Sequence, residues 1–328
     1  MNALIVCHAG LGMGLGHLTR SLVVAHALQQ ELNLGVKLLI QGDAIKRDDL
    51  DEFAHQFMGV EENLANKILQ QAKSSEALVV ALDLHPRLVP TDIDDLLKEL
   101  RRGGRKVVGV DGLVKHRANL DLIFIPSFRF FQSESAIGET PILFGWDSFL
   151  LNVKHTANDW KKGNQVLALA GGSDATNLGK TMPVLLNESL PSDTELHWVT
   201  GPYAQQPNLP VSPRISILNH QSPSSLDDLM IGANYAVTAY GVSFFELIYY
   251  GVPTVVFSPY GNKDDAELAA ITVEGVALVA RDEVDAVAKL KKLMADDALA
   301  ASLSACARQR LSVMGGRKLA QAVERLIA

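Results

Sequence analysis

Short apolar runs alternate with amphipathic segments along most of the chain. In the first half the apolar runs cover residues 4–7, 36–40, 77–82, 107–110 and 122–125. Runs of this length without polar alternation are typical of strands buried on both faces of a sheet. The segments between them, such as residues 18–28 and 91–102, carry apolar residues at helical spacing. The pattern predicts a parallel sheet with right-handed helical crossovers, which is the α/β class.

The same alternation restarts in the second half. Apolar runs cover residues 166–170, 196–200, 215–218, 235–238 and 252–258. The aromatic and polar stretch 145–164 is predicted to be the passage between domains, and the polar region 43–75 to form outer helices. We therefore expect two doubly wound Rossmann-like domains, residues 1–150 and 151–328, that face each other across a cleft.

A glycine-rich loop joins the first predicted strand to the first helix. Its glycines are Gly10, Gly12, Gly14 and Gly16. Glycine permits positive φ and close approach of a ligand, and a helix start presents free N–H groups and a positive dipole end. His17 stands at this start, where a charged imidazole is disfavoured, so a neutral ring and a candidate general base are expected. Alternatively, the loop is only a tight turn and His17 a polar cap.

Other polar residues of the first half follow predicted strands. Asp83 and Asp111 come directly after two of the apolar runs, and Arg20 lies one helical turn after His17. Ligands of parallel sheets bind at this carboxyl edge, although either aspartate could instead be a turn or cap residue. The basic stretches 101–106 and 115–117 are interpreted as a solvated face rather than a partner site.

Two loops of the second half are suited to a phosphate group. One joins a strand to a helix after residue 170, and the other precedes the helix at residue 244. The candidate nucleotide contacts are Gly171, Gly172, Ser173, Asp174, Asn177, Gly241, Val242 and Ser243. Backbone N–H groups, hydroxyls and helix N-termini can hold a diphosphate without a lysine. Neither a P-loop nor a complete dinucleotide fingerprint is present.

Further polar candidates lie on the same predicted edge. Glu246 is one turn into its helix, within reach of a ribose, or simply a glutamate favoured by the helix dipole. Asn262, Asp264 and Glu267 occupy a polar loop and are candidates to touch a sugar, or to cap the next helix. No metal is expected, because the pair Asp264-Asp265 has no third ligand implied, and no cofactor is expected.

Composition narrows the function classes. The chain has 328 residues, 48% of them apolar, and a net charge of -7, which argues against a nucleic-acid partner. Cys7 and Cys306 form no disulfide framework, so a reducing, cytoplasmic location is expected. No secretory signal is recognised, and no apolar run approaches the ~20 residues needed to span a bilayer. The oligomeric state is left open.

Three segments together resemble the glycosyltransferase-B (GT-B) superfamily. They are GLGHLTR around His17, LAGGSDATN at 169–177 and TAYGVSFFELIYYGVPT at 238–254. Their order and spacing are most similar to the UDP-sugar hydrolase of pseudaminic acid biosynthesis and its spore-coat relatives. The lipid II-forming N-acetylglucosaminyltransferase is a more distant relative. The similarity extends from the first loop to about residue 275.

The resemblance implies a UDP nucleotide held by the C-terminal domain and a sugar facing the N-terminal one. His17 matches the base that activates water against the anomeric carbon, and Asp83 matches an aspartate that ends a strand. Gly172, Ser173, Asp174 and Asn177 match the first nucleotide loop of the family, and Ser243 and Glu246 match the phosphate and ribose positions of the second. Gly14, Gly16, Arg20, Asp111, Asn262 and Glu267 are assigned to the substrate side. Leu84-His85 departs from the family, which has a tyrosine after the aspartate.

Three functions remain open at this point. The first is hydrolysis of a UDP-sugar by water, in surface-polysaccharide or flagellin sugar biosynthesis. The second is transfer of the sugar to a carbohydrate or lipid acceptor by the same residues. The third is a nucleotide-sugar-binding protein without catalysis, against which the presence of His17 speaks.

Overall fold

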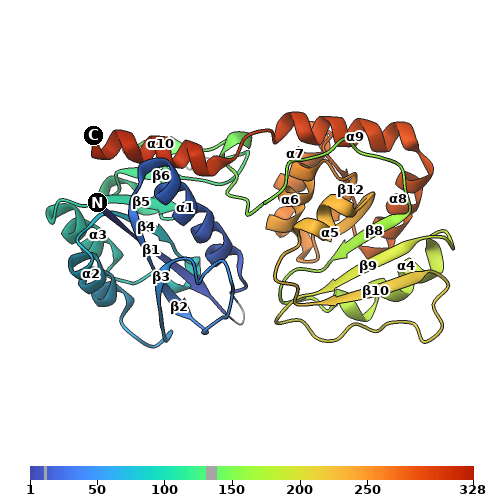
Figure 1. The fold of residues 1–328 in the computed structure, drawn as a ribbon, viewed down its shortest axis with the longest axis horizontal. Helices are drawn as coiled ribbons and strands as arrows, with labels where there is room; N and C mark the ends of the chain where they lie inside the picture. The colour runs from blue at the N-terminus through green and yellow to red at the C-terminus, as the bar shows by residue number, and fades with distance from the viewer. Residues whose placement is uncertain (11–12, 131–138) are drawn as a thin grey trace. The chain divides into compact units, whose positions relative to one another are not determined.

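The computed structural model describes residues 1–10, 13–130 and 139–328 and divides them into two compact units (Figure 1). The first unit comprises Met1–Asn152 together with Val313–Ala328, and the second comprises Val153–Ser312. Both are built on a parallel sheet covered by helices on its two faces. No helix in the described part of the chain is long and apolar enough to cross a membrane.

The first unit contains a parallel sheet in the order β3-β2-β1-β4-β5-β6-β7. Its strands are β1 Asn2–Ala9, β2 Gly35–Gly42, β3 Ala54–Met58, β4 Ala77–Asp83, β5 Lys106–Val110, β6 Leu122–Phe124 and β7 Ile142–Leu143. Its helices are α1 Gly16–Leu32, α2 Leu64–Ser74, α3 Ile93–Arg102 and α10 Gly315–Ile327, with 3-10 turns η1 Pro86–Leu88, η2 Val114–Asn119 and η3 Trp146–Ser148. Helices α1 and α10 bury their apolar sides on one face, and α2 and α3 on the other.

One prediction for this unit is wrong. The polar region 43–75, expected to form only helices, contains the strand β3 before helix α2. Strand β3 lies at the edge of the sheet and is only partly buried, so its sequence AHQFM shows no continuous apolar run. An edge strand of this kind is hidden from a search for buried runs.

The last helix packs on the first unit, although the sequence boundary assigned residues 151–328 to one domain. Leu319 and Val323 of α10 are fully buried in the same cluster as Leu22 and Leu28 of α1. In Figure 1 this helix, drawn in red, lies alongside α1, drawn in blue. The amphipathic spacing at 317–327 predicts the helix, but an apolar stripe does not say which sheet will cover it.

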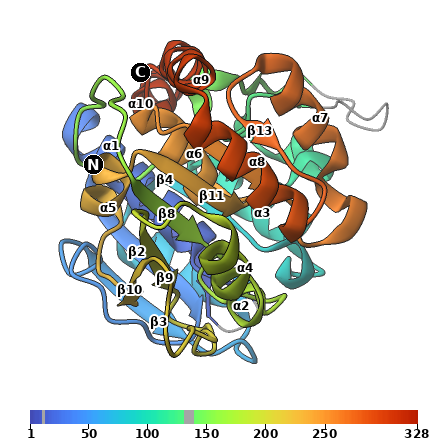
Figure 2. The ribbon, with the colours of Figure 1, turned by 90° about the vertical axis from the view of Figure 1, so that its right-hand side faces the viewer.

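The second unit contains a parallel sheet in the order β10-β9-β8-β11-β12-β13. Its strands are β8 Gln165–Leu169, β9 Glu195–Thr200, β10 Ser216–Gln221, β11 Tyr235–Ala239, β12 Thr254–Phe257 and β13 Leu278–Val279. Its helices are α4 Met182–Ser189, α5 Asp227–Gly232, α6 Val242–Tyr250, α7 Asp265–Glu274, α8 Glu283–Ala295 and α9 Asp297–Arg310, with 3-10 turns η4 Leu178–Lys180 and η5 Gly261–Asp264. Helices α4 and α8 cover one face of the sheet (Figure 2), and α5 and α6 cover the other.

Each sheet has one position where the winding direction reverses. In the first unit β1 and β4 are neighbours, and the helices that follow them, α1 and α3, lie on opposite faces. In the second unit β8 and β11 are neighbours, and α4 and α6 lie on opposite faces. In open α/β sheets the loops on either side of such a reversal diverge at the carboxyl edge, which is where the ligands of these sheets bind.

Candidate functional site

The glycine loop of the first unit leaves strand β1 at this reversal point. Gly10 and Gly14 pair with each other, with Gly14 N donating to Gly10 O at 2.9 Å. Gly10 has φ +145°, and a Cβ there would lie 2.5 Å from Asp43 Oδ2, so a side chain is excluded. Gly14 has φ +74° and nothing within 4 Å of the place of a Cβ, so its backbone is open to a ligand. Gly12 of the same loop lies outside the described residues.

Helix α1 begins directly after this loop and places two predicted residues over the end of β4. The helix starts at Gly16, so His17 and Arg20 belong to its first turns. His17 Nδ1 lies 2.6 Å from Asp83 Oδ1, and Arg20 binds both oxygens of Asp83, through Nε at 3.0 Å and Nη2 at 2.9 Å. The structure therefore brings His17, Arg20 and Asp83 into contact. The sequence predicts them at the same carboxyl edge of the sheet.

Asp111 completes this cluster from the neighbouring strand. It follows β5 with φ 55°, and its Oδ2 lies 2.7 Å from Arg20 Nη2. Burial alone would raise the pKa of Asp83, but Arg20 and His17 outweigh it and hold that pKa below its usual value. Burial would likewise lower the pKa of Arg20, yet Asp83 and Asp111 raise it. Asp83 is therefore ionised, and the Arg20 guanidinium pairs with both Asp83 and Asp111.

The geometry assigns the tautomer of His17. Nδ1 lies 2.6 Å from Asp83 Oδ1 and 3.1 Å from Arg20 Nη2. The nearer partner is a carboxylate, which only accepts hydrogen bonds, so we assign the proton to Nδ1, from which it forms the hydrogen bond to Asp83. Nε2 then keeps its lone pair, and within the described ranges no hydrogen-bond partner reaches it. The His17 side chain is 14% exposed, and the edge of the His85 ring lies against it at 5.6 Å between centroids. An imidazole with an oriented Nδ1–H and an open Nε2 can accept a proton from a nucleophile.

His8, at the end of β1, is a supporting residue that the sequence reasoning missed. It is fully buried, with the backbone N–H of His85 donating to its Nδ1 at 2.9 Å and its Nε2 lying 3.1 Å from Gln41 Oε1. These contacts fix a neutral ring that holds the turn directly after Asp83. Burial lowers the pKa of His8 from 6.5 to about 4, with Gln41 opposing the shift. The sequence signal for such a role is a polar residue, His8, inside the otherwise apolar run LIVCHA.

This pKa predicts a loss of stability in acid. The unfolded chain binds a proton at His8 below about pH 6.5, whereas the folded chain resists it until about pH 4. The contribution of neutral His8 to the free energy of unfolding is fully present above pH 6.5. About 3 kcal/mol of it is lost as the pH falls to about 4. Urea titrations across this pH range measure the free energies of unfolding of the wild type and of His8→Gln. The difference between the two should shrink by about that amount toward low pH. A constant gap would show that His8 does not titrate on unfolding.

In the second unit the two predicted phosphate loops follow the adjacent strands β8 and β11. Gly171 has φ +86°, and Gly171, Gly172 and Gly241 have nothing within 4 Å of the place of a Cβ. Helix α6 begins at Val242 directly after Gly241, so the first-turn N–H groups, those of Val242 and Ser243 among them, have no intrahelical acceptor. These open glycines and amides can receive an anion at the reversal point.

The loop 171–177 differs from the prediction in its connection. The helix expected directly after it begins only at Met182, after the 3-10 turn η4. Asp174 is used within the loop: its Oδ1 accepts the N–H of Leu178 at 2.7 Å and its Oδ2 accepts that of Gly179 at 2.8 Å. Asn177 has φ 57° and precedes η4. The carboxylate of Asp174 therefore shapes the loop, and the open backbone at Gly171 and Gly172 is left for a ligand.

The remaining predicted residues lie on α6 and in the loop after β12. Glu246 is buried in α6 and Asn262 is exposed in η5, while Glu267 lies in the first turn of α7. Asp264 accepts a hydrogen bond from Ser258 Oγ at 2.5 Å, which closes this loop on itself. Burial, followed by the charges of Asp264 and Asp174, raises the pKa of Tyr260, so the loops after β8 and β12 are electrostatic neighbours. No group of three or more potential metal ligands is found in residues 1–10, 13–130 and 139–328.

Solved structures share this architecture. No protein-family profile and no curated protein sequence matches the chain. MurG of Acinetobacter baumannii is similar at a TM-score of 0.64 and 14% identity, over 99% of this chain and 100% of that one. UGT2 of Phytolacca americana, complexed with UDP-2-fluoro-glucose and pterostilbene, gives 0.67 and 13% over 99% of both chains.

A putative UDP-N-acetylglucosamine 2-epimerase from Listeria monocytogenes gives a TM-score of 0.65 at 11% identity, over 100% of this chain and 97% of that one. TM-scores of this size show a shared fold, and at identities this low the likeness shows the fold alone. With two parallel, doubly wound sheets and these neighbours, the chain has the GT-B fold, as the sequence predicts.

Proposed function

We propose that this protein is an enzyme that cleaves the anomeric C–O bond of a UDP-sugar by attack of water, releasing UDP. The observation that carries the proposal is the His17–Asp83 contact of 2.6 Å, which leaves Nε2 of a partly exposed ring open at the ligand-binding edge of the sheet. Two of the neighbouring structures are described as complexes with UDP or a UDP-sugar, which supports the substrate class.

The reaction follows from the residues. Water attacks the anomeric carbon as its proton passes to His17 Nε2, and Asp83 stabilises the imidazolium that forms. The new bond joins the water oxygen to the carbon, and the electron pair of the broken C–O bond leaves with the diphosphate. The amides at Gly171, Gly172 and the start of α6 stabilise the charge that develops on that diphosphate. The first unit thus serves the sugar and the second the nucleotide, with Glu246 at the ribose.

Some substrate-side residues have a clearer role in this proposal than others. Gly14 leaves backbone open beside the base, and Gly16 is the first residue of α1. Arg20 holds Asp83 rather than the sugar, and Asp111 pairs with Arg20. In this proposal Asn262 of η5 and Glu267 in the first turn of α7 contact the sugar. The setting proposed from the sequence resemblance is surface-polysaccharide or flagellin sugar biosynthesis.

The competing proposal is a glycosyltransferase, in which an acceptor hydroxyl replaces water at Nε2. It is supported by neighbours that are described as glycosyltransferases, CalG4 and SnogD among them, and by the same base and anion loops. Incubating a panel of UDP-sugars with the protein alone separates the two, because only a hydrolase releases UDP without an acceptor. UDP that appears only on addition of an acceptor would exclude the hydrolase. A binding protein without catalysis would be stabilised thermally by a UDP-sugar and release nothing.

Gly201 follows strand β9 and lies against the loop 171–177, so it offers a separate test of the nucleotide site. A Cβ at Gly201 would lie 2.3 Å from Gly172 O, so Gly201→Ala must displace that loop. We expect the Kd for UDP, measured by calorimetry, to rise about tenfold, which corresponds to about 1.4 kcal/mol. Gly232→Ala is the matched control, because its Cβ would meet nothing closer than 3.7 Å. Unchanged affinity in Gly201→Ala would place the nucleotide elsewhere.

A further inference from the structure

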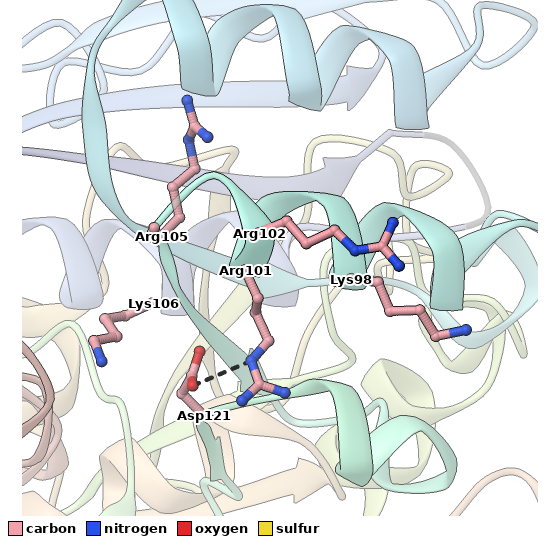
Figure 3. Close-up of a pocket in the computed structure, with 7 residues that line it drawn as sticks. Lys98, Arg101, Arg102, Arg105, Lys106 and Asp121 are labelled. Atoms are coloured by element: carbon pink, nitrogen blue, oxygen red, sulfur yellow. Dashed lines mark ion pairs between the residues drawn. The ribbon is translucent and has the colours of Figure 1, made fainter.

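The turn from α3 to β5 lines a pocket of about 450 Å³ in the first unit (Figure 3). The residues around this basic pocket are Lys98, Arg101, Arg102, Gly104, Arg105, Lys106 and Asp121. The sequence predicts a solvated face at residues 101–106, and residues 101–104 are exposed. The four basic residues in this stretch line the pocket together with Lys98. Strand β5 begins here at Lys106 and ends next to Asp111, so the pocket lies about 16 Å along the strand from the candidate site.

The charge of the pocket is one-sided. Five cationic side chains and a single carboxylate line it, in a chain whose net charge is -7. Basic residues in a last helical turn are favoured by the helix dipole, which accounts for Arg101 and Arg102. Arg105 and Lys106 come after the end of α3 and have no such reason to be basic. The concentration of positive charge is therefore more than the helix end requires.

Several donors of these cations are not used within the protein. The side chains of Arg102 and Lys106 make no hydrogen bond or ion pair with any residue that the structure describes. Arg105 donates from its Nη atoms to the carbonyls of Gly103 and Ala72, yet its Nε is buried without a partner. A buried donor without a partner costs free energy unless a ligand or water satisfies it.

The other two cations, Arg101 and Lys98, have contacts within the protein, and Arg101 Nη1 donates to the carbonyl of Ala118 at 3.2 Å. Arg101 Nε lies 3.3 Å from Asp121 Oδ1, while Asp121 Oδ2 accepts the N–H of Val107 at 2.8 Å. Lys98 Nζ lies 3.6 Å from Asp95. Asp121 is thus committed to the backbone, and it neutralises only one of the surrounding charges.

We propose that the basic pocket binds a small, multiply charged phosphate-type anion. Guanidinium groups present planar, paired donors that match phosphate oxygens, and lysines add point charge. A volume of about 450 Å³ suits a small molecule, and an excess of four positive charges suits a diphosphate or triphosphate better than a single carboxylate. The site is independent of the proposed function, because it lies at the opposite end of β5.

Inorganic tripolyphosphate is the probe, titrated into the full-length protein by calorimetry at about 0.1 M salt, where surface attraction is screened. Arg102→Gln/Lys106→Gln removes two cations without a partner in the described chain. Lys291→Gln/Lys292→Gln removes two exposed cations of α8 and is the control matched in charge. The first pair should raise the Kd of one binding step about tenfold or more, and the control should leave it unchanged.

The anion loops of the second unit can bind the same probe, so two binding steps are expected in the wild type. Loss of one step in Arg102→Gln/Lys106→Gln, with an unchanged thermal unfolding temperature, supports the proposal. Equal losses in both double variants, or no saturable step assigned to the pocket, would overturn it. Vesicles with 30% phosphatidylglycerol form a second arm: binding to vesicles but not to tripolyphosphate would make this a lipid surface and also contradict the proposal.

Discussion

Replacing His17 by glutamine is expected to lower kcat for UDP release by about 10²–10⁴-fold, the usual contribution of a general base. Glutamine keeps the size and a donor toward Asp83, but it has no lone pair able to take the proton of water at neutral pH. The Kd for UDP, measured by calorimetry, should stay within about twofold, because His17 contributes nothing to the nucleotide in this mechanism. A large loss of UDP affinity would instead make His17 a phosphate-binding residue.

Two further variants sharpen this result. Asp83→Asn should also lower kcat, since an amide oxygen orients the ring but does not stabilise an imidazolium. His26→Gln is the matched control on the same helix, because its ring lies 4.0 Å from Glu52 at the surface and away from Asp83. Normal turnover in His26→Gln together with loss in His17→Gln excludes a general effect of altering α1.

Removing Arg20 is expected to cost the largest amount of stability in the first unit. Arg20→Met leaves Asp83, whose side chain is 2% exposed, without its cation and leaves Asp111 without its partner. Breaking a buried pair from one side typically costs about 3–5 kcal/mol, because the remaining charge is stranded. Urea unfolding near neutral pH measures this difference directly.

The sign of the pH dependence provides an internal check. Arg20 holds the pKa of Asp83 low in the wild type, so that contribution is present at neutral pH and is lost as the pH falls through the folded pKa. In Arg20→Met the hydrogen bond from His17 remains but the guanidinium charge is gone, so burial moves the pKa of Asp83 upward from its wild-type value and acid relieves the stranded charge. The stability gap should therefore narrow toward low pH. A gap of less than 1 kcal/mol at neutral pH, similar to that of the exposed control Arg281→Met, would contradict a buried pair.

The sequence predicts most of the strands at the centre of each sheet, because both their faces are largely buried and their runs are mostly apolar. It does not predict β3 or the two-residue strands β7 and β13, whose alternating or very short patterns resemble loops. The reversal points follow from strand order, and strand order is a tertiary property that no local run records. The fold class is therefore within reach of the sequence, while three of the four edge strands are not. The fourth edge strand, β10, overlaps the predicted run 215–218.

The sequence predicts which residues form the candidate site better than it predicts the contacts between them. Glycine loops and strand-end aspartates indicate His17, Asp83 and Asp111, because parallel strands end together at one edge. The sequence does not show that Arg20 bridges both aspartates, or that His8 holds the turn of His85, since these contacts depend on side-chain directions across neighbouring strands. Asp174 illustrates the reverse case: a polar residue in a ligand-like loop is occupied by its own backbone.

The return of α10 to the first unit has a consequence for how the chain folds during synthesis. Leu319 and Val323 complete a core whose other members, such as Leu22 and Leu28, are translated almost three hundred residues earlier. Until residues 315–327 leave the ribosome, the part of α1 that packs on α10 has no cover, and the second unit is free to fold first. Such a chain favours assistance by a chaperone that shields this part of α1, and it ties completion of the first unit to completion of the second.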